Sequence, residues 1–341
     1  MLGGVRKVTA SVPADVSGTS FTFTPADSGE FNLQARGLIE AYPSDWGPLF
    51  AVTAIAGPAG GGPITPDPAS PLPPVAGTAA RLINLSVRTS AGRDAAALVV
   101  GFSLSGAAEK PVLIRAVGPT LGVFGVPGTL GDPTLSVKNA TGATVLENDN
   151  WGGTAALASA AARLGAFALD AASRDAVVLP TLRAGSYTTT VSPAGATAPG
   201  VALVELYDAD TAAVSRLVNV SARAPVGTGS EVLVVGFAVG GTGNRNVLIR
   251  AIGPTLAAFG VAEALADPKL EVFQNGVLLR SSDNWNPNLA PLFARVGAFE
   301  LTANSADAAL ALALAPGTYT VQVSGVGNTT GVALVEVYEL P

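Results

Sequence analysis

The sequence contains no cysteine and no histidine, and its single methionine is Met1. Without cysteine, the chain has no disulfides, no thiol nucleophile and no Cys/His zinc site. Without histidine, it has no Ser-His-Asp triad and lacks the usual general base near neutral pH. Only carboxylates, Lys, Tyr, Ser, Thr or a metal held by oxygen ligands remain for catalysis. The composition therefore favours a structural or binding protein, and we predict that the chain is not an enzyme.

Charge and long apolar runs are also scarce. Charged residues make up 13% of the chain, about half of the ~25% usual for soluble domains, and the net charge is −6. Lys occurs four times and the fifteen Arg are scattered, so the sequence predicts no nucleic-acid binding. The longest apolar candidate, residues 308–316, is about half of the ~18–20 residues of a membrane helix, so we predict no membrane insertion.

The N-terminus, residues 1–7, has no apolar segment after its charges and does not resemble a signal peptide. We therefore expect either a processed fragment or export by another signal. The lack of cysteine fits an extracellular bacterial protein, and we predict an extracellular or cell-surface location.

An internal duplication is the strongest feature of the chain. Residues 112–126 read VLIRAVGPTLGVFGV and residues 247–261 read VLIRAIGPTLAAFGV, with twelve of fifteen positions identical at an offset of 135. Towards the C-terminus the offset shrinks to 131, and small deletions of this kind are tolerated in loops between rigid strands. The sequence predicts two copies of one domain, at residues 81–208 and 216–341, with a link too short to allow them much freedom.

The periodicity within each copy is mostly two, which is typical of strands. Residues 319–324 (YTVQVS) alternate apolar and polar, and Asn275-Gly276 between two apolar runs indicates a type I′ hairpin. Residues 155–164 are Ala-rich and predict a short helix, whose counterpart at 288–296 contains Pro291 and should be brief. We therefore predict an all-β fold of two tandem homologous β-sandwich or jelly-roll domains, each with about eight to ten short strands.

The motifs RLINLSVR, LIRAVGPTL, DNW, GAF, AGSYT and ALVELYD together resemble a repeat near the C-terminal ends of large predicted secreted proteins of environmental bacteria. Residues 132–207 and 267–338 are also similar to bacterial pre-peptidase C-terminal domains, with a D-P-x-L start, an acidic N-D-x turn and a G-x-Y-x-x-x-V strand. Neither family has an agreed enzymatic role. The resemblance implies a β-sandwich accessory or surface module.

Residues 1–56 do not share the repeat. Their strands, predicted over 8–12, 20–24, 30–37 and 49–55, resemble the closing strands of an immunoglobulin-like domain. A complete domain of that kind needs ~7 strands, so we predict a small incomplete immunoglobulin-like β unit with open edges that invite pairing with another chain. Its apolar positions are our candidates for assembly contacts: Val8, Val12, Phe21, Phe23, Phe31 and Leu33.

Residues 57–80 are dominated by Pro and Gly and predict an extended segment. One interpretation is a flexible spacer between the first unit and the repeats. The other is an arm that lies along a neighbouring subunit.

Two acidic turns are candidates for calcium binding. Glu147 and Asp149 lie in one turn, and Asp283 lies in the equivalent turn of the second copy. Carboxylates suit calcium, but calcium takes six to eight oxygen ligands and each turn offers one or two carboxylates. The alternative is a turn in which the aspartate caps local N–H groups.

Two arginines and two tryptophans also stand out. Arg115 and Arg250 lie in apolar strands and need buried carboxylate partners, for which Asp132/Asp267 and Glu205/Glu336 are the candidates. Trp151 and Trp285 follow the acidic turns. These tryptophans could stack on sugar rings, but one per copy favours a packing role.

Three functions remain open at this level. The first is a structural subunit of an extracellular filament or surface layer, a homopolymer of this chain joined head-to-tail by β-strand addition through the N-terminal region. The second is a non-catalytic adhesion module of a larger secreted protein that recognises cell-surface glycans. The third, an enzyme, is disfavoured by the lack of His and Cys.

Overall fold

The structure is a computed structural model of the chain, and it describes residues 29–33, 38–39, 42–43, 50–54, 80–210 and 215–341. The chain divides into two compact units, residues 1–68 and 69–341.

The first unit contains four described strands: β1 (Gly29–Leu33), β2 (Leu38–Ile39), β3 (Tyr42–Pro43) and β4 (Phe50–Ala54). β1 pairs antiparallel with β4, and β2 pairs antiparallel with β3. The described parts of the strands predicted at 30–37 and 49–55, residues 30–33 and 50–54, therefore pair with each other. The predicted strands at 8–12 and 20–24 lie outside the described residues, as do Val8, Val12, Phe21 and Phe23, whereas Phe31 and Leu33 belong to β1.

The second unit contains both copies of the repeat. Copy 1 has strands β5 (Arg81–Ala91), β6 (Leu98–Gly106), β7 (Lys110–Val117), β8 (Pro133–Asn139), β9 (Thr144–Asn148), β10 (Ala176–Val178), β11 (Thr181–Leu182), β12 (Gly185–Pro193) and β13 (Gly200–Asp208). Copy 2 has strands β14 (Ser215–Val226), β15 (Leu233–Gly240), β16 (Arg245–Ile252), β17 (Pro268–Gln274), β18 (Val277–Ser282), β19 (Ala308–Leu314), β20 (Gly317–Gly325) and β21 (Gly331–Glu339).

Helices are short and occupy equivalent places in the two copies. The α-helices are α1 (Ala155–Arg163) and α2 (Ala290–Val296), close to where the sequence predicts them. The 3₁₀ turns are η1 (Asp94–Ala96), η2 (Pro119–Phe124), η3 (Gly229–Glu231), η4 (Pro254–Phe259), η5 (Pro287–Leu289) and η6 (Val326–Asn328). In the described part, no helix combines the length and the apolar character that a membrane crossing requires.

The strands form an antiparallel sandwich of two layers, which are joined where Leu217 of β14 pairs with Leu82 of β5, and this confirms the predicted all-β class. One sheet has the order β9-β8-β12-β6-β14-β21-β16-β19. In the other sheet, β10 and β11 lie one after the other along the same edge of β7. The order then continues β7-β13-β5-β15-β20-β17-β18. The turn between β17 and β18 is of the predicted type I′. Its central residues Asn275 and Gly276 both have positive φ, 51° and 77°.

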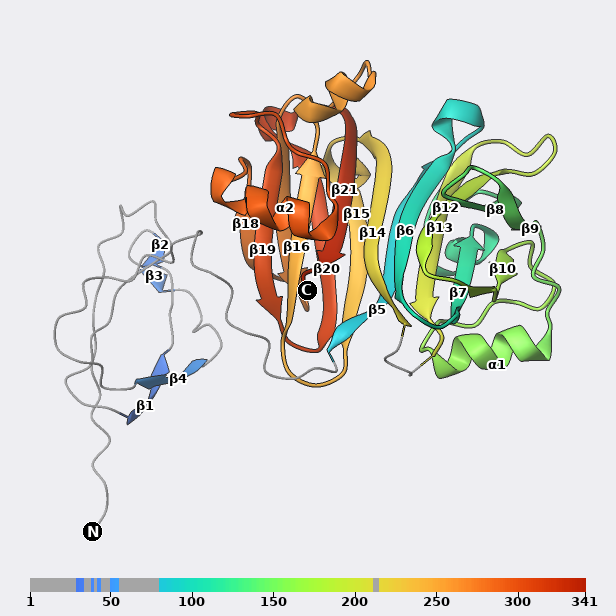
Figure 1. Cartoon of the computed structure of the whole chain (residues 1–341), viewed down its shortest axis with the longest axis horizontal. Coiled ribbons are helices and arrows are strands. Elements are labelled where there is room, and N and C mark those ends of the chain that lie inside the picture. Colours follow the sequence, from blue (N-terminus) through green and yellow to red (C-terminus); the bar gives the residue numbers. More distant parts are fainter. Residues whose placement is uncertain (1–28, 34–37, 40–41, 44–49, 55–79, 211–214) are drawn as a thin grey trace, which may run out of the picture. The chain divides into compact units, whose positions relative to one another are not determined.

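Both sheets run through the two copies without a break. β5, the first strand of copy 1, pairs with β15, the second strand of copy 2, and β14 pairs with β6 in the same way. Each pairing skips one residue, Ile83 in β5 and its counterpart Val218 in β14. The junction is therefore pseudo-twofold. Figure 1 shows these four strands in the middle of the unit, with β18 and β19 at one end and β9 and β10 at the other.

The core follows from this arrangement. Apolar residues on the inner faces of both copies, such as Leu85, Val87, Phe102, Val220 and Phe237, belong to one continuous buried cluster. Two smaller clusters lie on the outer faces, under α1 in copy 1 and under α2 in copy 2. Because one apolar core is shared, the copies form a single body.

Candidate functional site

The two buried arginines have the glutamate partners that the sequence offered. Arg115 Nε lies 2.9 Å from Glu205 Oε2, and Arg250 Nε donates to Glu336 Oε2 at 2.8 Å. Asp132, the other candidate in copy 1, instead pairs with the exposed Arg174. A buried ion pair needs further hydrogen bonds to offset desolvation, and the neighbouring tyrosines supply them.

Each glutamate also accepts a hydrogen bond from a tyrosine two residues later. Tyr207 Oη donates to Glu205 Oε1 at 2.8 Å, and Tyr338 Oη donates to Glu336 at 2.9 Å. Burial and the adjacent glutamate raise the pKa of Tyr207 and of Tyr338 well above the usual tyrosine value. Burial likewise raises the pKa of Glu205, although Arg115 opposes this. These groups are buried and bonded to one another, so they tie the adjacent strands of each copy together.

The repeated GPT turns are held by two aspartates that the sequence analysis did not single out. Asp175 is fully buried and accepts hydrogen bonds from Gly118 N at 2.8 Å and from the Thr120 hydroxyl. Asp307 makes the same contacts to the turn at Gly253, with a distance of 2.7 Å to its N–H. The signal available in the sequence was the Ser-x-Asp pattern, which recurs at an offset of 132.

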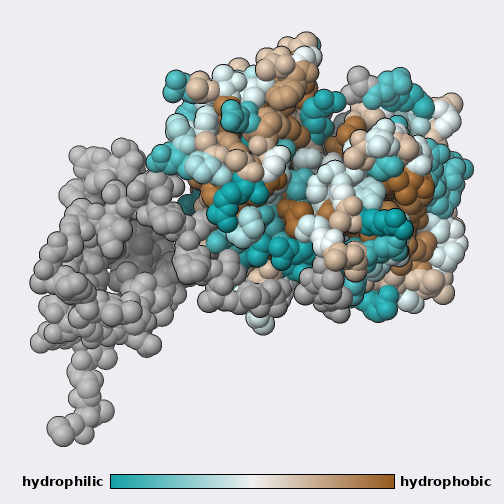
Figure 2. Space-filling model, viewed as in Figure 1, coloured by the Kyte–Doolittle hydropathy of each residue, from teal (hydrophilic) through white to brown (hydrophobic). Residues whose placement is uncertain are grey.

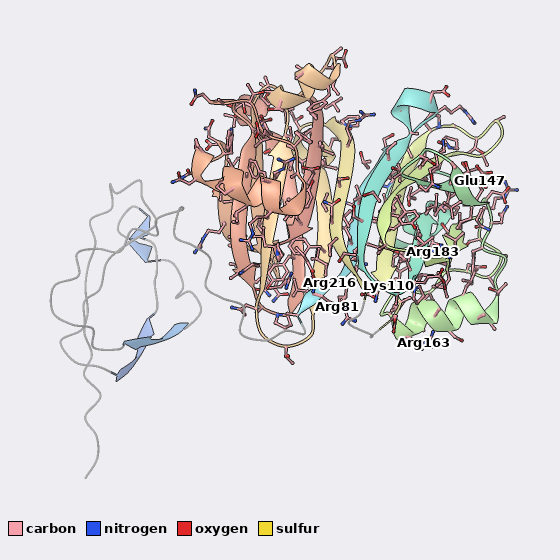
Figure 3. The ribbon with its side chains drawn as sticks, in the orientation of Figure 1. Arg81, Lys110, Glu147, Arg163, Arg183 and Arg216 are labelled. Atoms are coloured by element: carbon pink, nitrogen blue, oxygen red, sulfur yellow. The ribbon has the colours of Figure 1, made fainter. Side chains whose placement is uncertain are left out.

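The calcium candidates are spread over the surface. Glu147 lies on β9, where its carboxylate accepts a hydrogen bond from Ser136, and Asp149 follows in an exposed loop. Asp283 is exposed in the other copy. Figure 3 shows Glu147 at the outer side of copy 1, beside β9. No group of three acidic residues that could hold a metal occurs among the described residues, so the geometry adds no support to this prediction.

The tryptophans pack rather than form a platform. Trp151 is 6% exposed, and its indole N–H donates to Asp170 O at 3.0 Å. Trp285 is half-buried, and its ring centroid lies 5.6 Å from that of Phe293. The indole of Trp151 therefore belongs to the packing under α1.

An ionic cluster closes the base of the junction. In copy 1, Asp208 binds Arg81 at 3.2 Å and Lys110 at 2.6 Å. In copy 2, Glu339 binds Arg216 at 3.1 Å and also accepts the Leu82 N–H of copy 1 at 2.8 Å. Figure 3 shows Arg81, Lys110 and Arg216 gathered at this place. The cluster ties the last strand of one copy to the first strand of the other.

The sheet edges differ in a way that bears on assembly. β19 reads AALALAL and pairs only with β16 in the described part of the chain. Opposite Ala313, Asn246 directs its carbonyl away from β19 to the Leu340 N–H, at 2.9 Å. The backbone groups of Ala313 therefore point outward from the sheet, as do those of Ala309 and Ala311 by the alternation of antiparallel ladders.

The equivalent edge of copy 1 is protected. At an offset of 132, Pro180 stands where copy 2 has Leu312, and it separates β10 from β11. The outward Val177 N–H is occupied by Asn148 Oδ1 at 3.0 Å. Pro180 itself faces β7, since its carbonyl accepts the Val112 N–H at 3.0 Å, so it interrupts the edge strand without removing an outward N–H. Interruption of the strand and side-chain capping are two devices that hinder pairing with another chain. Copy 2 has neither device at these positions, since Ser282 replaces Asn148 and bonds to Asn284 instead.

A groove crosses the outer face of the junction. It has a volume of about 410 Å³ and is lined from both copies, by Ser86, Arg88, Leu121, Phe124, Val126, Phe167, Leu203, Val234, Gly236 and Thr320. Phe124 is 60% exposed and stands edge-on against Phe167, with ring centroids 5.0 Å apart. Phe259 of copy 2 repeats this geometry with Phe299 at 4.9 Å. Figure 2 shows hydrophobic residues on the visible face as separate patches among polar ones.

No protein-family model and no curated protein matches the chain. Among solved structures, the chain is similar to a DUF4785 family protein from Legionella pneumophila, with 8% sequence identity over 77% of this chain and 81% of that one. The TM-score is 0.23, which is too low to inform either fold or function.

Proposed function

We propose that the chain is a structural subunit of an extracellular filament or surface layer, in which the N-terminal region of one subunit adds a strand to β19 of the next. The open edge of β19 is the observation that carries this proposal. β19 contains no charge and no proline, whereas natural edge strands normally carry such guards, and its outward residues Ala311 and Ala313 are partly exposed.

The other edges of the described body are less suited to strand addition. β18 carries Arg280 and β9 carries Glu147, and the third edge is divided between β10 and β11. An acceptor at one end of a rigid body and a donor elsewhere in the chain make a heterologous contact, which does not close on itself and so propagates.

The donor is expected in residues 1–56. Residues 20–24 (SFTFT) alternate polar and apolar as a strand does, and β-strand addition places alternate side chains in pockets of the acceptor. The segment 57–80 then serves as the arm that carries the donor to its neighbour. A role without catalysis agrees with the buried carboxylates, which are engaged by arginine, tyrosine or backbone donors.

Electron microscopy of the purified chain, negatively stained at several concentrations, tests the proposal. The informative variant is Ala313→Pro, which removes one outward N–H and leaves the pairing with β16 intact. Its matched control is Thr181→Pro, at the equivalent position of the protected edge. We expect regular fibres from the parent chain and from the control, and none from Ala313→Pro or from the chain without residues 1–78.

Two results would contradict strand addition at β19. One is a monodisperse monomer at every concentration. A monomer would also result if the N-terminal segment paired with β19 of its own chain, and this too would contradict addition between subunits. The other is fibre formation by Ala313→Pro equal to that of its control. Thermal unfolding of each variant checks that loss of fibres does not come from loss of the fold.

A second candidate function is adhesion through glycan binding in the junction groove. The exposed ring of Phe124 beside the hydroxyls of Ser86 and Thr320 and the guanidinium of Arg88 favours it, because sugars combine apolar faces with hydroxyls. Binding to an immobilised glycan panel, lost in Phe124→Ala but retained in the neighbouring Val123→Ala, would support this role. Equal binding by the two variants, or none by the parent chain, would exclude it at this site.

A further inference from the structure

A small cavity beneath α1 distinguishes copy 1 from copy 2. It has a volume of about 90 Å³, and its walls include Arg115, Trp151, Leu157, Ala161 and Val177. Exposed alanines of α1 and of the following loop, among them Ala158 and Ala168, also line it, so one side reaches solvent. The buried guanidinium of Arg115 therefore lies in the wall of a largely apolar cavity that is open to solvent on one side.

In copy 2 an aromatic ring occupies the equivalent place. Ala161 corresponds to Phe293, because the carbonyl of each accepts the N–H of the Ala in the GAF motif, Ala166 at 3.0 Å and Ala298 at 2.9 Å. Phe293 is 1% exposed and its ring lies 4.8 Å from the Arg250 guanidinium. Copy 1 thus has a methyl group where copy 2 has a benzyl side chain.

The guanidinium of Arg115 is left with capacity for a ligand. In copy 2, Nε and Nη2 of Arg250 both donate to Glu336, at 2.8 and 2.5 Å. In copy 1, Nε of Arg115 faces Glu205 Oε2 at 2.9 Å, whereas the buried Nη2 makes no hydrogen bond to the described residues. One face of Arg115 is covered by Phe167, whose ring centroid lies 4.3 Å away.

We propose that the cavity under α1 binds a neutral molecule with one aromatic ring and one hydrogen-bond acceptor, such as a benzyl alcohol or a phenol. The ring takes the place that Phe293 fills in copy 2, and the acceptor oxygen meets the N–H groups of Arg115 Nη2. A cation close to an aromatic face is a favourable contact, stronger when it is desolvated.

The volume of the cavity and the charges in its wall further restrict which ligands can bind. An engineered apolar cavity of ~150 Å³ binds benzene. The cavity under α1 is smaller, at about 90 Å³, so a single ring must project in part through the open side, and a fused ring system is too large. The ligand is neutral, because Glu205 already balances the charge of Arg115 and a second buried anion would be left without a partner.

The test uses 4-fluorobenzyl alcohol as the probe and follows the width of its fluorine NMR line as the full chain is added. We expect concentration-dependent broadening with the parent chain. Ala161→Phe, which supplies the missing ring, should weaken binding by more than about tenfold. The control Ala156→Phe places the same ring on the same helix, at an exposed position outside the cavity, and should leave binding unchanged.

Phe293→Ala provides a second, independent measurement. It opens the equivalent cavity in copy 2, so a chain that carries this change should bind two probe molecules instead of one. Absence of binding by the parent chain, or equal binding by Ala161→Phe and Ala156→Phe, would overturn the proposal. If Ala161→Phe does not fold, a stoichiometry of one in Phe293→Ala would overturn it as well.

Discussion

Gly236 lies directly opposite Ser86 across the junction between the two copies, and a Cβ at residue 236 would stand 2.5 Å from the Ser86 hydroxyl. The pseudo-twofold mate of this pair, Gly101 and Ser221, repeats the relationship at 2.6 Å. The missing side chain lets each copy lay its second strand against the first strand of the other.

A valine at residue 236 is therefore expected to loosen the junction. Its side chain would collide with the Ser86 hydroxyl, which must change rotamer inside the packed junction, so Gly236→Val should lower the free energy of unfolding by about 1–3 kcal/mol. Urea denaturation measures this. Gly236→Ser should also destabilise, and adding Ser86→Gly in the same chain should recover most of the loss. An unchanged urea midpoint for Gly236→Val would contradict this expectation, because it would mean that the junction accommodates the larger side chain.

The buried ion pair of copy 1 offers a second test. Arg115→Met leaves the Glu205 carboxylate buried without its cation, and removal of one partner of such a pair costs about 3–5 kcal/mol. Because Met and Leu need no partner, the double change Arg115→Met with Glu205→Leu should be clearly more stable than the single change. Calorimetric Tm values compare the two. Equal stability of the single and double variants would mean that Glu205 is solvated in the folded chain.

Tyr207 and Tyr338 predict a loss of stability in alkali. Burial and the adjacent glutamates raise the pKa of both hydroxyls, so the folded chain keeps these protons at a pH where the unfolded chain, with a tyrosine pKa of about 10, releases them. Since the folded state then binds more protons, the free energy of unfolding falls as the pH rises above about 10.

The double variant Tyr207→Phe, Tyr338→Phe removes this source of pH dependence. Its free energy of unfolding should vary less with pH in alkali than that of the parent chain, although it will be lower near neutral pH because two hydrogen bonds are lost. Urea unfolding at a series of alkaline pH values, with tyrosinate absorbance as a second probe, checks both statements. Identical slopes for the two chains would contradict the assignment.

Local features of the fold were predictable because they depend on near neighbours in the sequence. The Asn275-Gly276 turn needs only two residues that accept positive φ, and α1 begins and ends close to the limits of its Ala-rich run. The glutamate partners of Arg115 and Arg250 were among the candidates because a buried arginine requires a carboxylate.

The junction was not predictable in the same way. In an isolated copy β5 and β6 would both be edge strands. Their apolar and polar residues alternate as in any strand, so neither sequence indicates that its partner strand belongs to the other copy. Asp175 was overlooked because its donors, Gly118 and Thr120, are far from it in sequence. Pro180 is visible in the sequence, but its meaning as an edge guard appears only once β10 and β11 are known to lie at the border of a sheet.

The self-complementary junction makes a prediction about a single copy. The first two strands of each copy are matched to those of the other, so the fragment 216–341 should pair with a second molecule of itself through β14 and β15. Analytical ultracentrifugation should show a dimer that dissociates on dilution, and Gly236→Val should weaken it. A stable monomeric fragment would contradict this, because β14 and β15 would then need no partner.

Because the two copies belong to one chain, their sequences can differ from each other. In a symmetric dimer of separate chains every substitution occurs twice, so both ends of the assembly would be the same. Here Pro180 divides one outer edge strand while Leu312 leaves its counterpart continuous. The tandem body consequently has two unlike outer edges. In the filament that we propose, this difference would give growth a single direction, which two identical halves could never specify.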